Sequence, residues 1–130
     1  MEISSTQDQA NVPVTIFHLK GHLDGEQPLW NSAQEAYQAG ARHFLLDLSQ
    51  VALVSSAGMR VLHNIFMMLR QDQSGQDEQT VKMGIASGSY TSPHLKLLKP
   101  SEAVQRALRV AGFDMFLEIH QDYKKALASF

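Results

Sequence analysis

Residues 43–70 read HFLLDLSQVALVSSAGMRVLHNIFMMLR. The run 43–48 is short and mostly apolar, which is typical of a central strand, and a second apolar segment at 51–54 leads directly to two serines. From Met59 onward the apolar residues follow the 3.6-residue period of a helix that ends near Arg70. They are Val61, Leu62, Ile65, Phe66 and Leu69. The stretch therefore predicts a strand and then a helix, with Ser56 at the entrance of the helix.

The residues before this stretch predict a strand and a helix of their own. Residues 12–19 alternate β-branched and aromatic residues and close on Gly21, which indicates a strand followed by a turn, and we expect 2–6 to pair beside it. Pro28 suits the first turn of the next helix, and Gly40 suits the left-handed backbone conformation that commonly ends a helix. The apolar positions of this helix are Leu29, Trp30, Ala33, Ala36 and Tyr37.

The residues after the stretch predict two further strand and helix pairs. The polar stretch 71–92 is rich in Gly and Ser and predicts an exposed excursion or hairpin around 81–83. Residues 95–98 follow as a short strand, and 116–119 as the last one. Ser101 is expected to cap a helix that ends at Gly112. The apolar positions of this helix are Val104, Ala107, Leu108 and Ala111, and those of a terminal helix are Tyr123, Ala126, Leu127 and Phe130.

This alternation of strands and helices predicts an α/β fold. We expect a mixed sheet with parallel central strands and an antiparallel N-terminal pair, covered by about four helices. The length of 130 residues suits one domain, 1–130, into which the excursion at 71–92 is inserted.

Composition excludes several classes of function. The formal net charge of −2 comes with scattered Lys and Arg residues, so no basic face is expected for nucleic acid. The absence of cysteine excludes disulfides, thiolate metal sites and cysteine nucleophiles. The opening residues lack the pattern of a signal peptide, and no apolar run approaches the length that spans a bilayer, so we expect a cytoplasmic protein without a membrane segment. No glycine-rich phosphate loop is found, and no cofactor is expected.

The segment 54–59, VSSAGM, is the part of the sequence most informative about chemistry. A serine at a helix entrance usually caps the helix, and one hydroxyl suffices for that. Ala57 and Gly58 are small, which a cap does not require, and they leave the entrance open to another protein. A phosphoryl group on Ser56 would face unpaired N–H groups and the positive end of the helix dipole. Arg60, four residues beyond Ser56, could pair with that phosphoryl group or remain a solvated helix residue.

At this point nearly the whole chain resembles the STAS domains of bacterial anti-sigma factor antagonists, also called anti-anti-sigma factors. Four segments together carry the resemblance. They are LKGHLD at 19–24, FLLDLSQV at 44–51, SSAGMRVL at 55–62 and AGFD at 111–114.

The resemblance implies a regulatory protein and no enzyme. In this family a partner anti-sigma factor, which is a serine kinase, phosphorylates the serine at that helix start, and a PP2C-type phosphatase reverses the modification. By resemblance the phosphoacceptor is Ser56, with Ser55 as the fallback. The partner-binding residues implied are Asp24, Ser55, Ser56, Gly58, Met59 and Arg60. The usual aspartate of the motif is replaced here by Ser55, and its second serine by Ala57.

Two alternative functions and the oligomeric state remain open. The replacement at Ser55 is compatible with a STAS adaptor in a signalling or transport complex that is never phosphorylated, and the sequence leaves open whether the chain forms a homodimer. A small serine hydrolase built on Ser56 lacks the glycine that a nucleophile elbow needs two residues earlier, where Val54 stands. His94 or His120 would have to serve as its base, with Asp114 or Asp122 as orienter. We expect no metal site, because the turn at Gly21 separates His18 from His22.

Overall fold

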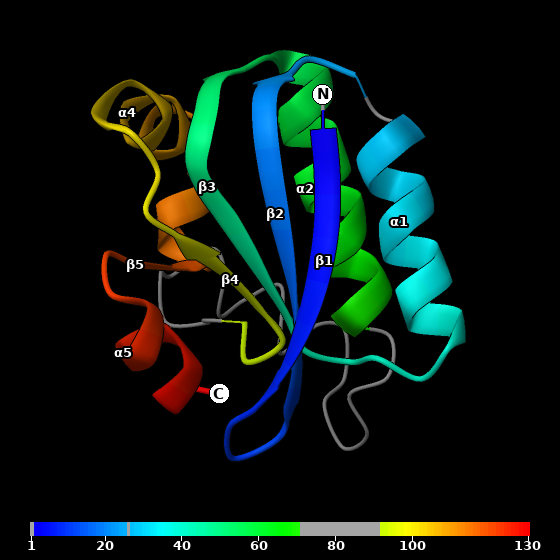
Figure 1. The fold of residues 1–130 in the computed structure, drawn as a ribbon. Helices are drawn as coiled ribbons and strands as arrows, with labels where there is room; N and C mark the ends of the chain where they lie inside the picture. The colour runs from blue at the N-terminus through cyan, green and yellow to red at the C-terminus, as the bar shows by residue number, and fades with distance from the viewer. Residues whose placement is uncertain (1, 26, 71–91) are drawn as a thin grey trace.

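The computed structural model describes residues 2–25, 27–70 and 92–130 (Figure 1). Its strands form one five-stranded sheet in the order β1-β2-β3-β4-β5. The first pair is antiparallel and the other three pairs are parallel, which confirms the predicted fold class. The strands are β1 (Glu2–Gln9), β2 (Pro13–Leu23), β3 (Phe44–Val54), β4 (Leu95–Leu98) and β5 (Glu118–His120).

Four helices and one short 3-10 helix are found in the described parts of the chain. They are α1 (Gln27–Gln38), α2 (Ser56–Arg70), α4 (Glu102–Val110), α5 (Tyr123–Ala128) and the 3-10 helix η1 (Phe113–Met115). The excursion predicted at 71–92 lies outside the described residues except for Ser92. No helix in the described ranges combines the length and the apolar character that crossing a bilayer requires.

The sheet separates a large apolar core from a small one. Alternate side chains of β2, β3 and β4 pack with α1, α2 and α4 in the large core, which includes Phe17, Leu46 and Leu62. The intervening positions face α5, where a cluster of five buried residues is built from Val14, Ile16, Leu45, Leu98 and Ala126. Figure 1 shows α1 and α2 next to each other on one side of the sheet and α5 on the other.

Several local predictions are confirmed. Ser101 caps α4, because its Oγ accepts a hydrogen bond from the N–H of Val104 at 3.2 Å. Gly112 follows this helix with a φ of 83°, and Gly40 follows α1 with a φ of 108°, as left-handed stops require. The helices therefore end where their glycines allow the chain to turn.

The strands differ from the prediction in three places. β2 does not turn at Gly21 but continues to Leu23, with register shifts against β3 on either side of that glycine, whose φ is 109°. The two apolar segments at 43–48 and 51–54 belong to one strand, β3. The last strand begins at Glu118 instead of residue 116, because η1 occupies the residues just before it. A glycine within a strand can mark a bulge as well as a turn, and in β2 the strand is irregular around Gly21 and continues.

Candidate functional site

The ends of β2 and β3 bring two separated segments of the chain together. Leu23 and Val54 are register partners at the carboxyl ends of these parallel strands. The backbone N–H of Ser55 donates a hydrogen bond to the carbonyl of Leu23 at 3.0 Å. Asp24, which follows Leu23 and is exposed, therefore lies at the same end of the sheet as the start of α2.

Ser55 is the residue that caps α2. Its Oγ accepts a hydrogen bond from the N–H of Gly58 at 3.3 Å and donates one to the carbonyl of Leu23 at 3.4 Å. The carbonyl of Ser55 accepts the first helical bond, from the N–H of Met59 at 2.9 Å. These bonds satisfy one of the N–H groups that every helix start leaves without an intrahelical acceptor.

Ser56 is the first helical residue and is exposed to solvent. Within the described part of the chain its hydroxyl makes no hydrogen bond, and the N–H groups of Ser56 and Ala57 have no acceptor. A hydroxyl that is exposed and not used for capping remains accessible to a second macromolecule. It also lies beside two backbone donors that an added anion could use.

Gly58 has an internal role that the sequence did not indicate. It is buried, and a Cβ at this position would overlap the carbonyl oxygen of Leu23 and lie 2.9 Å from the Cγ of Leu23. The glycine lets the first turn of α2 approach the end of β2 closely. This packing gives Gly58 a role within the fold, and its predicted role at the partner surface stays a prediction.

The remaining predicted site residues lie around the same helix start. Met59 is half-buried and packs against the large core, whereas Arg60 is exposed on the next turn of α2. The structure thus places Asp24, Ser56 and Arg60 on the surface at one end of the sheet. Ser55 and Met59 are partly accessible there.

An apolar groove adjoins this helix start and was not predicted from the sequence. It has a volume of about 460 Å³ and lies between the start of α2 and one side of α4. We call it the α2–α4 groove. Its walls include Ser55, Ser56 and Met59 on one side and Arg106, Ala107 and Val110 on the other. Sequence periodicity assigns such residues to helices but cannot show that two helices face each other.

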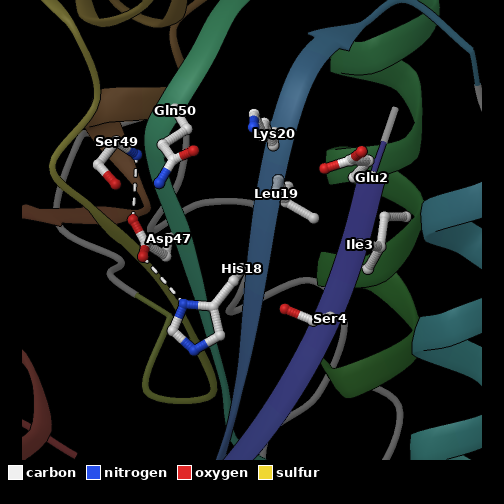
Figure 2. A pocket seen from close by; sticks show the side chains of 9 residues that line it. All are labelled: Glu2, Ile3, Ser4, His18, Leu19, Lys20, Asp47, Ser49 and Gln50. Carbon is white, nitrogen blue, oxygen red and sulfur yellow. Dashed lines mark hydrogen bonds and ion pairs between the residues drawn. The ribbon is translucent and has the colours of Figure 1, made fainter.

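A second hollow lies on the same face of the sheet as α5, beyond the part that α5 covers (Figure 2). It has a volume of about 400 Å³ and is lined by residues of β1, β2 and β3. The Nδ1 of His18 and the Oδ2 of Asp47 are 3.0 Å apart in it, and the Nε2 of His18 is 3.1 Å from the Oγ1 of Thr6. His18 therefore pairs with a carboxylate on the neighbouring strand and connects three strands of the sheet.

The environment of Asp47 keeps it ionised. Partial burial raises the pKa of this carboxyl, but hydrogen bonds from the hydroxyl and the N–H of Ser49 and the pairing with His18 outweigh the burial, and the net pKa is lowered. The signal that could have identified the pair is the polar character of both residues within otherwise apolar strands. The sequence does not give the register that brings them together.

The other histidines considered as catalytic bases lie away from Ser56. The carbonyl of His94 accepts a hydrogen bond from the N–H of Phe44, at the end of β3 opposite to Ser55. His120 lies 3.3 Å from the Oε1 of Glu118 on β5. Among the described residues, no group of three or more His, Asp or Glu side chains is placed to hold a metal ion.

The arrangement of these elements was compared with known proteins. No protein-family model and no curated protein matches the chain by sequence. Among solved structures, an anti-sigma factor antagonist from Mycobacterium paratuberculosis superposes with a TM-score of 0.66 at 15% identity, covering 98% of this chain and 93% of that one. The superposition covers most of both chains although few of their residues are identical. The chain has the fold of the anti-sigma factor antagonists.

Two further structures with this STAS fold support the assignment. SpoIIAA in its unphosphorylated form, an anti-sigma factor antagonist, gives a TM-score of 0.61 at 12% identity, over 96% of this chain and 93% of that chain. A candidate anti-sigma factor antagonist from Thermotoga maritima gives 0.60 at 20% identity, over 87% of this chain and 83% of that chain. At these identities the likeness establishes the STAS fold of the chain.

Proposed function

We propose that this chain is an anti-sigma factor antagonist that works by partner switching in the cytoplasm. In its unmodified form it binds an anti-sigma factor that is a serine kinase. Phosphorylation of Ser56 by that kinase ends the binding, and a PP2C-type phosphatase restores it. The chain is then a ligand and a substrate of its partners and catalyses no reaction itself.

The exposed and uncommitted hydroxyl of Ser56 is the observation that carries this proposal. Ser55 alone provides the cap of α2, so modification of Ser56 breaks no capping bond. A phosphoryl group there would gain the unpaired N–H groups of the first turn and the positive end of the helix dipole. It would also add a charge of about −1.5 to −2 to the surface through which the unmodified chain binds its partner.

The replacement of the usual aspartate by Ser55 is compatible with this function. Serine and aspartate are about equally good N-caps, and the Oγ of Ser55 makes the capping bond in this structure. The replacement therefore keeps the helix start in place. It removes one negative charge beside Ser56, which favours the approach of an anionic nucleotide and later the presence of a phosphate.

The partner surface in this proposal comprises Asp24, Ser55, Ser56, Met59 and Arg60 around the helix start. Gly58 contributes by letting α2 lie against Leu23, since its own position is buried. The surface combines one acidic group, one basic group and an apolar contact. Such a mixture suits specific and reversible protein binding.

The test is to identify the kinase by co-purification with the native protein and then to incubate it with ATP and the purified chain. Intact-mass measurement should show one added phosphate on the wild type. The addition should be lost in Ser56→Ala and kept in the matched variant Ser55→Ala.

Other outcomes would assign the chain differently. No added phosphate despite stable binding of the kinase would indicate the adaptor that is never phosphorylated. A phosphate that persists in Ser56→Ala and disappears in Ser55→Ala would move the modification to Ser55. Labelling of Ser56 by a serine-reactive phosphonate would contradict the proposal and favour the hydrolase.

A further inference from the structure

Ser56 and Arg106 face the same α2–α4 groove although they are 50 residues apart in the chain. Ser56 comes from the start of α2, and Arg106 comes from the middle of α4. Most of the remaining wall is apolar, with Val54, Ala107 and Val110 among its residues. Arg106 contributes the cationic side chain to an otherwise uncharged lining.

Arg106 is held only weakly in the structure. Its side chain is 70% exposed, and its contact is with the carboxylate of Glu102 one turn earlier on α4, at 3.6 Å. An exposed pair of this kind, at more than hydrogen-bond distance, contributes little to stability and breaks readily. The guanidinium is therefore available for a stronger anionic partner.

We infer that a phosphate on Ser56 recruits Arg106 across the groove and forms an intramolecular bridge from α2 to α4. This inference rests on the proposed phosphorylation of Ser56. A phosphate offers about twice the charge of the Glu102 carboxylate and three acceptor oxygens. Arginine binds such a group with two parallel N–H donors, which is the strongest geometry available to it.

The location of the groove favours the bridge further. The helix start at its edge supplies backbone donors to the same phosphate. Arg109 is also exposed on α4 but does not line the groove. Arg106 is thus distinguished from its neighbour on α4 by its position and not by its charge.

The bridge would have a regulatory effect beyond the added charge. The Arg106 side chain would lie over the groove and cover part of the apolar surface beside Ser55, Ser56 and Met59. Val110, which is 85% exposed at the edge of the groove, would become less accessible. Phosphorylation would then weaken partner binding both by repulsion and by covering an apolar contact.

The experiment installs phosphoserine at position 56 during translation in the full chain and follows its phosphorus NMR signal in a pH titration at low salt. An adjacent arginine stabilises the dianionic phosphate and lowers the midpoint of the titration. In the Arg106→Gln phosphoprotein the midpoint should rise by roughly half a pH unit relative to the wild type. In the matched variant Arg109→Gln, which removes the same charge from the same helix, it should change by less than half of that shift.

The inference is overturned if Arg106→Gln leaves the midpoint unchanged, or if Arg109→Gln shifts it equally, since a general loss of charge would then explain the effect. It is also overturned if Arg60→Gln shifts the midpoint and Arg106→Gln does not. Melting temperatures of the unphosphorylated variants verify that each remains folded. No kinase or other partner enters this titration, so failure of the bridge and failure of the proposed function give separate results.

Discussion

Of the two adjacent serines at the start of α2, one hydroxyl is hydrogen-bonded and the other is not, so the two should contribute differently to stability. The Oγ of Ser55 binds the N–H of Gly58 and the carbonyl of Leu23, whereas the hydroxyl of Ser56 faces solvent. Removing a capping side chain costs about 1 kcal/mol, and removing an exposed one costs much less. We therefore expect Ser55→Ala to lower the free energy of unfolding by about 1 kcal/mol and Ser56→Ala by less than about 0.5 kcal/mol.

Urea denaturation of both variants at neutral pH checks this difference. The two slopes against denaturant should match that of the wild type, so that the shift in midpoint reports stability alone. A larger loss for Ser56→Ala than for Ser55→Ala would show that the cap has been assigned to the wrong serine.

Gly58 is the residue at which the site depends most on close packing. A methyl group there would overlap the carbonyl of Leu23 and push the first turn of α2 away from β2. Overpacking of this kind typically costs 1–3 kcal/mol, and we expect Gly58→Ala to lose at least about 2 kcal/mol of unfolding free energy. Gly25→Ala is the matched control, because a Cβ at Gly25 has nothing within 4 Å. Equal stabilities of the two variants would refute the packing role.

The residues just before β3 and β4 include a histidine that makes stability depend on mild acid. The rings of His43 and His94 are 4.8 Å apart, and the ring of Phe130 meets His43 edge-on at 6.0 Å. Burial lowers the pKa of His43, and the nearby His94 and Lys96 lower this pKa further. The folded protein therefore binds a proton at this position less readily than the unfolded chain.

The sign of the pH dependence follows from this lowered pKa. The contribution of neutral His43 to stability is complete above the pKa of an unfolded histidine, about 6.5. It decreases as the pH falls from there through the lower pKa of His43 in the folded protein. We expect the melting temperature to fall between pH 7.5 and 5.5, and to fall by a smaller amount in His43→Phe, which keeps a ring and removes the titration.

His22→Gln provides the control for this measurement, since His22 lies on β2 at the end remote from His43. This variant should keep the wild-type response to pH. If the melting temperatures of His43→Phe and of the wild type fall by the same amount over this pH range, His43 is not the group responsible.

The helices were the elements most readily predicted from the sequence. The apolar period of α2 and the hydroxyl and glycine at the ends of α4 are local signals, and the structure confirms both helices. The path of β2 beyond Gly21 was not predictable, because it depends on pairing with β3, a contact between residues far apart in the chain. The assignment of the cap to Ser55 rather than Ser56 also needed the hydrogen bond from the N–H of Gly58 to the Oγ of Ser55.

Neighbouring residues of the groove could be predicted from the sequence where they form one contiguous segment, but not where helices or strands meet. Ser55, Ser56 and Met59 form one short segment, whereas Arg106 reaches the same groove only through the packing of α4 beside β3. The pairing of His18 with Asp47 likewise depends on strand register. Such contacts between distant parts of the chain become visible only in the folded molecule.

A negative charge at Ser56 should change the binding of the folded molecule and not its stability. A negative charge in the first turn of a helix is tolerated or mildly stabilising, and Ser56 has no capping bond to lose. We expect Ser56→Asp to weaken binding to the co-purified kinase at least tenfold, with an unfolding free energy within about 0.5 kcal/mol of the wild type. Calorimetric titration and urea denaturation measure the two quantities, and equal affinities of variant and wild type would contradict the expectation.

The unequal division of the apolar core implies unequal rates of local opening. α5 has six residues and packs in a cluster of five buried side chains, of which Ala126 is its own, whereas α2 has fifteen residues and packs against the large core. Detaching α5 exposes little apolar surface, so backbone amides there should exchange with deuterium long before those of α2 and β3. The start of α2, which carries Ser56, should therefore stay folded while α5 detaches and returns many times. A partner then meets the same rigid surface at each encounter.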